Sequence, residues 1–219
     1  MTNGLFQQFI EWVIFNGGIY VLLFIIFAET GLFVGFFLPG DSLLFLAGIY
    51  LNDLATNFFH AHYIFILLLV ILASFLGNIV GYWFGKKSGT RFYEWKDNLL
   101  FKKRYILKAK TFYDKYGKST IFLSKFLPII RTFAPIVAGI VHMPTRTFLI
   151  YNLAGSICWV TTMMLSGYFL ESWIENNYGF SLKNNIELIT ILIILITTLP
   201  VLYKLIQTKK SPDKSLVKT

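Results

Sequence analysis

Four ionisable side chains lie inside apolar stretches of the sequence, and they are the residues best suited to chemistry. Glu29 and Asp41 share one apolar stretch, and Lys125 and Arg131 share another. An ionisable side chain at membrane depth costs roughly 3 kcal/mol on insertion scales, so such residues usually serve a function. One stretch carries two acids and the other carries two bases. We therefore expect partial neutralisation of charge if the two stretches meet.

Arg131 is the strongest candidate for binding a ligand. It lies between Pro128 and Pro135, six residues beyond Lys125, with no acid nearby in the sequence. Its planar fork of donors suits a phosphate group, and its charge persists at any working pH. Unpaired N–H groups at the ends of broken helices also favour an anion. The pattern predicts an anion site at Arg131.

Each charged residue also has a structural interpretation. Asp41 follows Pro39–Gly40 and precedes an apolar run, so it could N-cap a returning helix. Glu29 could lie at the outer interface with its carboxylate in water, and Lys125 could extend to the cytoplasmic surface. Arg131 could pair with Glu29 or Asp41 in a purely structural role.

The elements that must position these residues are membrane helices. Of the 219 residues, 56% are hydrophobic and 14% are charged, whereas soluble domains carry about 25% charged residues. Residues 64–84 and 148–170 contain no charge, and residues 186–202 contain one. A fourth span starts near residue 10 or 17 and ends near residue 28. Because about 20 apolar residues cross the hydrocarbon core, the sequence predicts an all-α polytopic membrane protein with about four spanning helices.

Two further apolar stretches, 29–50 and 119–142, are interrupted by helix breakers. We expect breaks at Pro39–Gly40 in the first and at Pro128 and Pro135 in the second, because proline removes a helical hydrogen bond. Broken backbone at membrane depth is tolerated only inside protein or beside a watery cavity. Re-entrant hairpins therefore fit these stretches better than two more spanning helices.

The two hairpins resemble each other. The first reads "FLPGDSLLFLAGIY" and the second reads "FLPIIRTFAPIVAGIV", so both contain Phe-Leu-Pro and then Ala-Gly-Ile. Related units of opposite orientation predict an inverted-topology repeat, as in many transporters. We expect a single membrane domain over 1–219, divided into a first hairpin plus helix (29–84), a basic cytoplasmic amphipathic segment (86–118), a second hairpin plus helix (119–170), a last spanning helix (186–206) and a basic cytoplasmic tail (207–219).

The distribution of basic residues predicts the orientation. Segment 86–118 holds 11 Lys and Arg residues against three acids, and the tail is also basic. The positive-inside rule then places both termini in the cytoplasm, with the first hairpin opening outward and the second inward. The amphipathic segment is expected to dock on anionic headgroups rather than on nucleic acid, because it is tethered between membrane elements.

Signatures of enzymes and metal sites are absent from the sequence. No nucleophile motif, phosphate-binding loop or dinucleotide fingerprint occurs, so we expect neither catalysis nor a cofactor. His60 and His62 form a pair without a third ligand, which does not predict a metal site. Asn78 and Asn152 are expected to hydrogen-bond between spanning helices, and the glycines of "GNIVGYWFG" (77–85) favour close helix packing.

The sequence resembles the DedA family, also called the VTT or SNARE-associated Golgi protein superfamily, over about residues 29–168. The resemblance is carried by Glu29 and by three motifs: "FLPGDSLLFLAG" at 37–48, "GNIVGYWFGKKSG" at 77–89 and "SKFLPIIRTFAPIVAGIVHMPTRTF" at 124–148. Together these motifs are specific.

This resemblance implies a protein of the bacterial plasma membrane that moves lipids across the bilayer. Bacterial members are linked to recycling of undecaprenyl phosphate, and eukaryotic relatives to scrambling of phospholipids. It also implies functional roles for the acid pair Glu29 and Asp41 and for the basic pair Lys125 and Arg131. Relatives often carry arginine where this chain has Lys125, so charge is kept here and bidentate geometry is lost. Some members depend on the proton-motive force, which suits Glu29 or Asp41 as a protonatable group.

The leading hypothesis is therefore proton-coupled translocation of undecaprenyl phosphate or a similar anionic lipid. Arg131 and Lys125 would hold the phosphate, while Glu29 and Asp41 exchange protons and compete for the bases. Two alternatives remain open. The same residues could serve a proton-coupled transporter of a small soluble ion, or they could lock the hairpins together in a membrane scaffold that transports nothing.

Overall fold

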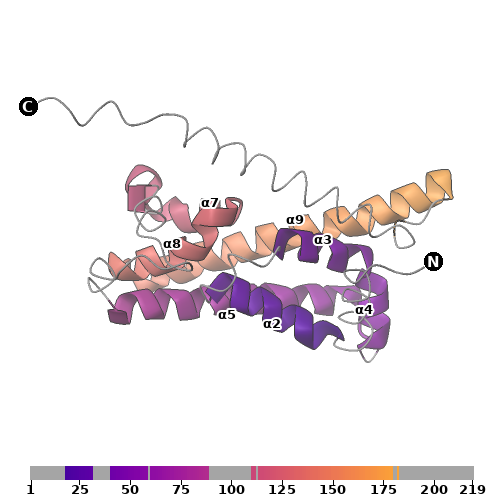
Figure 1. Ribbon diagram of the computed structural model, residues 1–219, viewed down its shortest axis with the longest axis horizontal. Coiled ribbons are helices and arrows are strands. Elements are labelled where there is room, and N and C mark those ends of the chain that lie inside the picture. Colours follow the sequence, from indigo (N-terminus) through magenta and orange to yellow (C-terminus); the bar gives the residue numbers. More distant parts are fainter. Residues whose placement is uncertain are drawn as a thin grey trace, which may run out of the picture.

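Two long antiparallel helices form the frame of the molecule (Figure 1). The computed structural model describes residues 18–31, 40–58, 60–88, 110–111, 113–179 and 182, and no strand occurs among them. The frame helices are α5 (Tyr63–Ser88) and α9 (Thr145–Tyr178), and both are long and apolar enough to cross a membrane. At 1.5 Å per residue each exceeds the roughly 30 Å hydrocarbon core. The expected all-α class is confirmed over the described residues.

The ends of these helices fix their relative direction. Lys86 in the last turn of α5 lies 3.5 Å from the hydroxyl of Thr145, where α9 begins. At the other end, the ring of Tyr63 stacks on Tyr168 with centroids 6.1 Å apart. The start of α5 thus lies beside the C-terminal part of α9, and the two helices run in opposite directions.

Among the described residues before α5 there are three shorter helices: α2 (Gly18–Gly31), α3 (Gly40–Ile49) and α4 (Leu51–Asn57). The span expected to end near residue 28 is described only from Gly18, and its described part, fourteen residues of α2, is shorter than a bilayer crossing. The expected last helix (186–206) and tail (207–219) lie outside the described residues, as does most of segment 86–118.

A second group of short helices precedes α9. It consists of the 3₁₀ turn η4 (Gly117–Ser119), α7 (Thr120–Ser124) and α8 (Pro128–Ile140). Between α7 and α8 the chain turns at residues 125–127, and α8 begins at Pro128, where a missing N–H is tolerated. The break expected at Pro135 is wrong, because α8 continues through it. Pro135 only removes the donor that would have bonded to the Arg131 carbonyl.

Two of the short helices, α3 and α8, each pack on the long helix that is more distant in sequence. A β-carbon at Gly48 of α3 would lie 2.0 Å from the carbonyl oxygen of Met164 in α9. Likewise, a β-carbon at Gly139 of α8 would lie 2.2 Å from the carbonyl oxygen of Tyr82 in α5. Gly48 and Gly139 are the glycines of the repeated Ala-Gly-Ile motif. The repeat therefore marks two backbone crossings that interlock the halves of the protein.

Polar side chains also join α5 to α9. The Asn78 amide donates to Asn152 Oδ1 at 2.7 Å, and Asn152 donates to the Phe75 carbonyl at 3.0 Å. Both asparagines are buried. The expected interhelical role of these two residues is confirmed.

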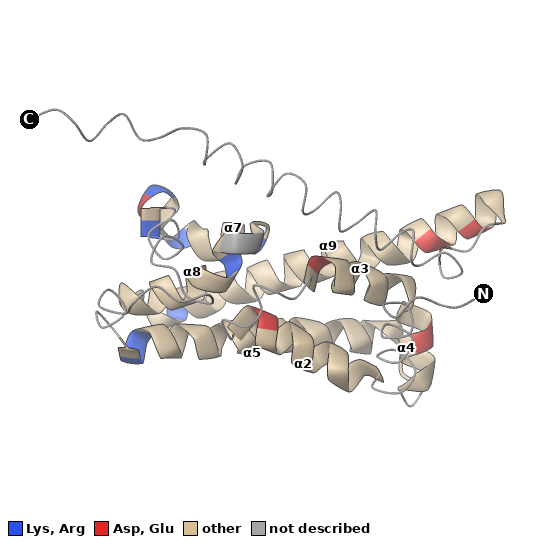
Figure 2. Cartoon of the chain, viewed as in Figure 1, with Lys and Arg blue, Asp and Glu red and all other residues tan. Residues whose placement is uncertain are grey.

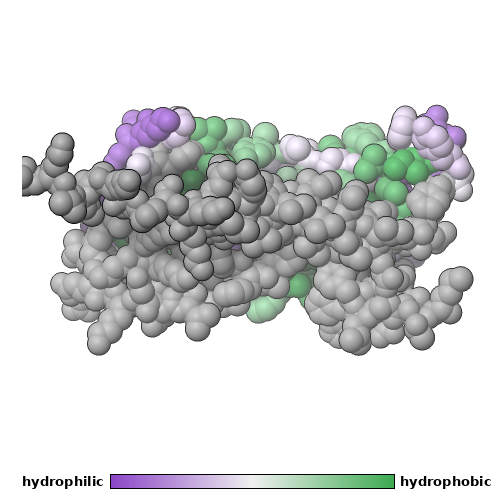
Figure 3. Space-filling view, turned by 45° about the horizontal axis from the view of Figure 1, so that its top comes forward, coloured by the Kyte–Doolittle hydropathy of each residue, from purple (hydrophilic) through white to green (hydrophobic). Residues whose placement is uncertain are grey.

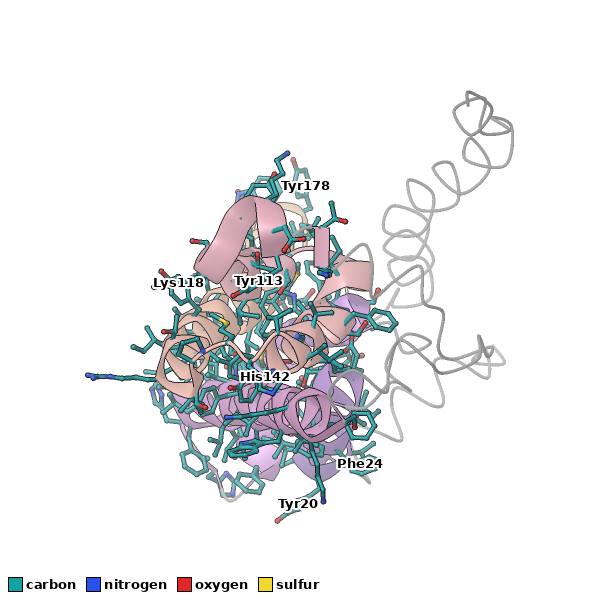
Figure 4. The ribbon with its side chains drawn as sticks, turned by 90° about the vertical axis from the view of Figure 1, so that its left-hand side faces the viewer. Tyr20, Phe24, Tyr113, Lys118, His142 and Tyr178 are labelled. Carbon is teal, nitrogen blue, oxygen red and sulfur yellow. The ribbon has the colours of Figure 1, made fainter. Side chains whose placement is uncertain are left out.

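The described surface suits a bilayer. Figure 2 shows basic residues at the end where α5 finishes and acidic residues on α4 and on the far part of α9, at the opposite end. In Figure 3 the described residues that are visible form a strip that is mostly hydrophobic between hydrophilic patches at its two ends. Figure 4 shows Tyr20 and Phe24 pointing outward from α2, and each is 67% exposed. An apolar exterior between polar ends is the pattern of a membrane protein.

The glycine crossings predict a position-specific response to small substitutions. A β-carbon at Gly85 would lie 2.1 Å from the carbonyl oxygen of Ile136, whereas one at Gly81, a turn earlier, would meet nothing closer than 3.5 Å. We expect Gly85→Ala to lower the free energy of unfolding in detergent micelles by about 1–3 kcal/mol, because backbone cannot yield as a side chain does. Gly81→Ala is the matched control and should cost little. Equal losses would show that the crossing does not limit stability.

Candidate functional site

Arg131 lies at the centre of the site. Its Nη1 donates to Asp41 Oδ1 at 2.5 Å, and its Nη2 donates to Glu29 Oε1. Both acids belong to the first half of the chain, at the end of α2 and the start of α3, whereas Arg131 lies in the first turn of α8. The structure thus brings together three of the four charged residues singled out in the sequence. Figure 2 shows the acidic positions of α2 and α3 near the middle of the long axis.

This ion cluster is enclosed by protein. The side chain of Glu29 is 0% exposed and that of Arg131 is 6% exposed, so the interpretation of Glu29 as an interfacial carboxylate in water is wrong. Asp41 retains 20% side-chain exposure. Removing one partner from a buried ion pair costs roughly 3–5 kcal/mol, because the remaining charge is left uncompensated. The cluster therefore constrains how the two halves of the protein fit together.

Asp41 is not the N-cap of the returning helix. The α3 helix begins at Gly40, which places Asp41 within its first turn. There its carboxylate accepts hydrogen bonds from Arg131 and from the indole of Trp159 instead of capping backbone N–H groups. The negative charge still lies favourably near the positive end of the helix dipole. Pro39, expected to contribute to the break, lies outside the described residues.

Gly40 makes room for the Glu29 carboxylate. A β-carbon at Gly40 would lie 1.4 Å from Glu29 Oε2 and 2.2 Å from its carboxyl carbon. Any side chain at this position would displace the carboxylate from Arg131. Gly40 therefore has a positioning role, in addition to starting α3.

Lys125 is buried near this cluster but turns to a different set of partners. It is 1% exposed, so the interpretation in which it extends to the cytoplasmic surface is wrong. Its Nζ donates to Ser74 Oγ of α5 at 2.8 Å. The Asn78 amide lies 2.9 Å away, and its oxygen accepts from Lys125 only in the orientation in which the amide no longer donates to Asn152 Oδ1. Among the described residues, no carboxylate lies within ion-pair distance of this ammonium group.

The path of the Lys125 side chain depends on another glycine. A β-carbon at Gly155 of α9 would lie 3.1 Å from Lys125 Cγ. The aliphatic part of the lysine thus passes α9 at a residue without a side chain, and its amine reaches α5. Lys125 therefore contacts both long helices from the turn between α7 and α8.

Trp159 also lies at this cluster, although the sequence did not reveal it. It lies on α9, is 0% exposed, and its Nε1 donates to Asp41 Oδ1 at 2.9 Å. The Arg131 guanidinium carbon lies 4.8 Å from the indole centroid, and Lys125 Nζ lies 5.6 Å from it. Cations this close to an indole face are stabilised by its quadrupole. A tryptophan inside an uncharged span gives no sequence signal, so only the fold identifies its role.

The charges of the four residues balance, and two of their polar atoms have no hydrogen-bond partner in the part of the chain that the structure describes. Two carboxylates and two cations sum to zero when all four are ionised. Among the described residues, Arg131 Nε and Glu29 Oε2 are buried without a hydrogen-bond partner. One guanidinium donor and one carboxylate oxygen therefore remain available for a further partner, and buried polar groups in proteins normally have one.

Comparison with known proteins identifies the family. The VTT domain matches residues 38–169. The chain is 39% identical to Protein DedA of Escherichia coli K12 over 90% of its length and 86% of that protein. It is 35% identical to a membrane protein of Mycobacterium tuberculosis over 83% of this chain and 75% of that one, and 32% identical to the E. coli K12 inner membrane protein YghB over 69% and 67%. No solved structure matches.

These matches cover most of the chain and include Asp41, Lys125 and Arg131 within the VTT domain. The protein belongs to the DedA family of VTT-domain membrane proteins. The resemblance carried by Glu29 and by the motifs at 37–48, 77–89 and 124–148 is thereby confirmed.

The contact between Gly40 and Glu29 predicts a strong coupling between the two positions. We expect Gly40→Ala to lower the free energy of unfolding by roughly 3–5 kcal/mol, because it displaces the carboxylate from Arg131 and leaves that charge uncompensated. In a Glu29→Ala background, the same change should cost less than about 1 kcal/mol, since no carboxylate occupies the space. Denaturant titration of the four variants in a double-mutant cycle measures this coupling. An equal cost in both backgrounds would contradict the positioning role of Gly40.

Proposed function

We propose that this protein is a non-enzymatic flippase of the bacterial plasma membrane that moves an anionic lipid, such as undecaprenyl phosphate, across the bilayer. The observation that carries the proposal is the buried Arg131 shared between Glu29 and Asp41. A guanidinium with two anionic partners in a membrane domain matches the requirements of a phosphate site. The lipid tail would stay in the bilayer while the headgroup enters the cluster.

The two carboxylates occupy the positions that phosphate oxygens would take. Each Nη atom of Arg131 donates to one carboxylate oxygen, as it would to a phosphate. A headgroup would therefore compete with Glu29 and Asp41 for the same donors. Lys125 would supply a second positive charge after leaving Ser74, since a lysine ammonium acts as a mobile point charge.

Electroneutrality connects this competition to protons. The four residues balance one another before a headgroup enters, and a phosphate monoester adds a charge of about −1.5 to −2 at neutral pH. A buried excess of negative charge is costly, so the displaced carboxylates would take up protons or turn toward water. Entry of the phosphate and protonation of Glu29 or Asp41 are therefore two parts of one exchange.

The short helices support a topology of two opposed re-entrant hairpins. Gly40, where α3 begins, touches the Glu29 carboxylate near the end of α2, so α2 and α3 would form one hairpin whose tip lies at the cluster. Similarly, α7 and α8 meet at the turn that carries Lys125. We infer that these hairpins enter from opposite sides, that the chain crosses the membrane several times, and that both termini are cytoplasmic.

A membrane scaffold is the second candidate function, and the direct Arg131–Glu29 pair favours it. If the cluster served only to lock the hairpins, its charges would matter as a pair rather than individually. Transport of a small soluble ion uses the same residues, and flux measurements distinguish it from lipid movement.

Replacing Arg131 tests the flippase directly. We expect Arg131→Ala to abolish translocation of a polyprenyl phosphate in proteoliposomes, because the headgroup loses its bidentate partner. Arg146→Ala is the matched control, since Arg146 is an exposed arginine on α9, and it should transport normally. Unimpaired transport by a folded Arg131→Ala protein would overturn the proposal. Uptake of radiolabelled inorganic phosphate without lipid movement would favour the soluble-ion alternative.

A charge exchange separates the flippase from the scaffold. The double variant Glu29→Arg, Arg131→Glu keeps an ion pair but moves the cation from α8 to α2. A flippase should lose transport, because the donor fork no longer lies beside Lys125 and Trp159. A scaffold should retain its stability and its cellular function, which thermal unfolding and complementation of a deletion strain would measure.

A further inference from the structure

Two hydrogen-bond donors from different helices converge on a single oxygen atom. Asp41 Oδ1 accepts from Arg131 Nη1 of α8 at 2.5 Å and from Trp159 Nε1 of α9 at 2.9 Å. A charged donor and a neutral donor thus define one position for an anionic oxygen. Both belong to the second half of the chain, whereas the oxygen that they bind belongs to α3.

Trp159 is suited to hold this position whether or not Asp41 occupies it. The indole is fully enclosed, and its N–H is a donor that cannot accept or lose a proton in the working pH range. Its ring lies within 6 Å of both cations, at 4.8 Å from the Arg131 guanidinium carbon and 5.6 Å from Lys125 Nζ. Such contacts stabilise a desolvated cation without adding a charge. The indole therefore keeps both bases stabilised while the carboxylates are displaced.

The N–H group itself requires a hydrogen-bond acceptor. An enclosed indole N–H usually has one, and a buried donor without an acceptor is destabilising. If Asp41 withdraws, its oxygen must be replaced by another acceptor that also fits the guanidinium. A phosphate oxygen meets both conditions, because it accepts from several donors at once.

We propose that Trp159 Nε1–H is a direct ligand of the substrate phosphate, donating to the oxygen that takes the place of Asp41 Oδ1. The ligand class is a phosphate monoester, with Arg131 Nη1 and the indole N–H sharing one of its oxygens. This inference rests on the proposed function, since it assigns a further binding residue to the same site. It makes Trp159 a substrate-binding residue rather than an apolar core residue of α9.

Removing the indole N–H tests the assignment. In proteoliposomes of phosphatidylcholine doped with a short polyprenyl monophosphate, we expect Trp159→Phe to raise the half-saturating lipid concentration about tenfold. A hydrogen bond to a charged group is worth this factor or more. The maximal rate should change little. Trp173→Phe is the matched control, because Trp173 is 56% exposed on the same helix, and it should leave both values unchanged.

A spectroscopic experiment keeps Trp159 in place and so does not depend on folding of that variant. Replacing the other four tryptophans (Trp12, Trp83, Trp95 and Trp173) by phenylalanine leaves Trp159 as the only indole. We expect its fluorescence emission to shift on addition of vesicles that contain polyprenyl monophosphate, and not with the neutral polyprenol. Inorganic phosphate is added separately: a shift with the lipid alone shows a headgroup site that needs the tail, and a shift with both shows recognition of the phosphate group itself.

The outcomes separate this inference from the proposed function. If Arg131→Ala abolishes transport while Trp159→Phe leaves the half-saturating concentration unchanged, the role of Trp159 is overturned and the flippase stands. If Arg131→Ala transports normally, both are overturned. If Trp159→Phe does not fold, the fluorescence experiment decides, and the absence of any shift with the polyprenyl monophosphate contradicts the assignment.

Discussion

The enclosed guanidinium of Arg131 is the constraint on which the rest of the structure depends. Burying a cation in a membrane domain is costly unless ion pairs or hydrogen bonds compensate for the lost hydration. Arg131 finds both partners in the other half of the chain, since Glu29 comes from α2 and Asp41 from α3. The two sets of short helices must therefore meet, and their meeting point fixes where each can lie along the long helices.

Glycines make that meeting sterically feasible. At Gly48 and Gly139 the short helices approach the long ones so closely that a β-carbon would overlap with a carbonyl oxygen. At Gly40 the missing side chain leaves space for the Glu29 carboxylate, and at Gly155 it allows the Lys125 stem to pass α9. In a bilayer, close packing and hydrogen bonds replace much of the hydrophobic driving force between helices. The glycines therefore allow both the close helix packing of the fold and the placement of the charged side chains in the site.

The site combines two arrangements of cations that differ in their ability to exchange partners. Arg131 is held by carboxylates, which a phosphate can replace oxygen for oxygen. Lys125 instead donates to a neutral acceptor, the hydroxyl of Ser74, which gives up a cation at lower electrostatic cost. Trp159 contacts both cations and one of the carboxylates. It thus links the ion-paired part of the site to the part in which a cation has a neutral partner.

The sequence by itself determined the helical membrane class, the family and the charged residues, because charge inside an apolar run and a repeated Phe-Leu-Pro motif are local signals. The helix break predicted at Pro135 was wrong, since neighbouring packing can maintain a helix through a missing hydrogen bond. The predicted N-cap role of Asp41 was also wrong, because α3 begins one residue earlier, at Gly40. Only the tertiary structure decided which charges pair, that Lys125 turns away from the acids toward Ser74, and that Trp159 belongs to the site. The physical reason is that these contacts join residues about 50 to 120 positions apart, and their geometry is set by helix crossings that no local pattern encodes.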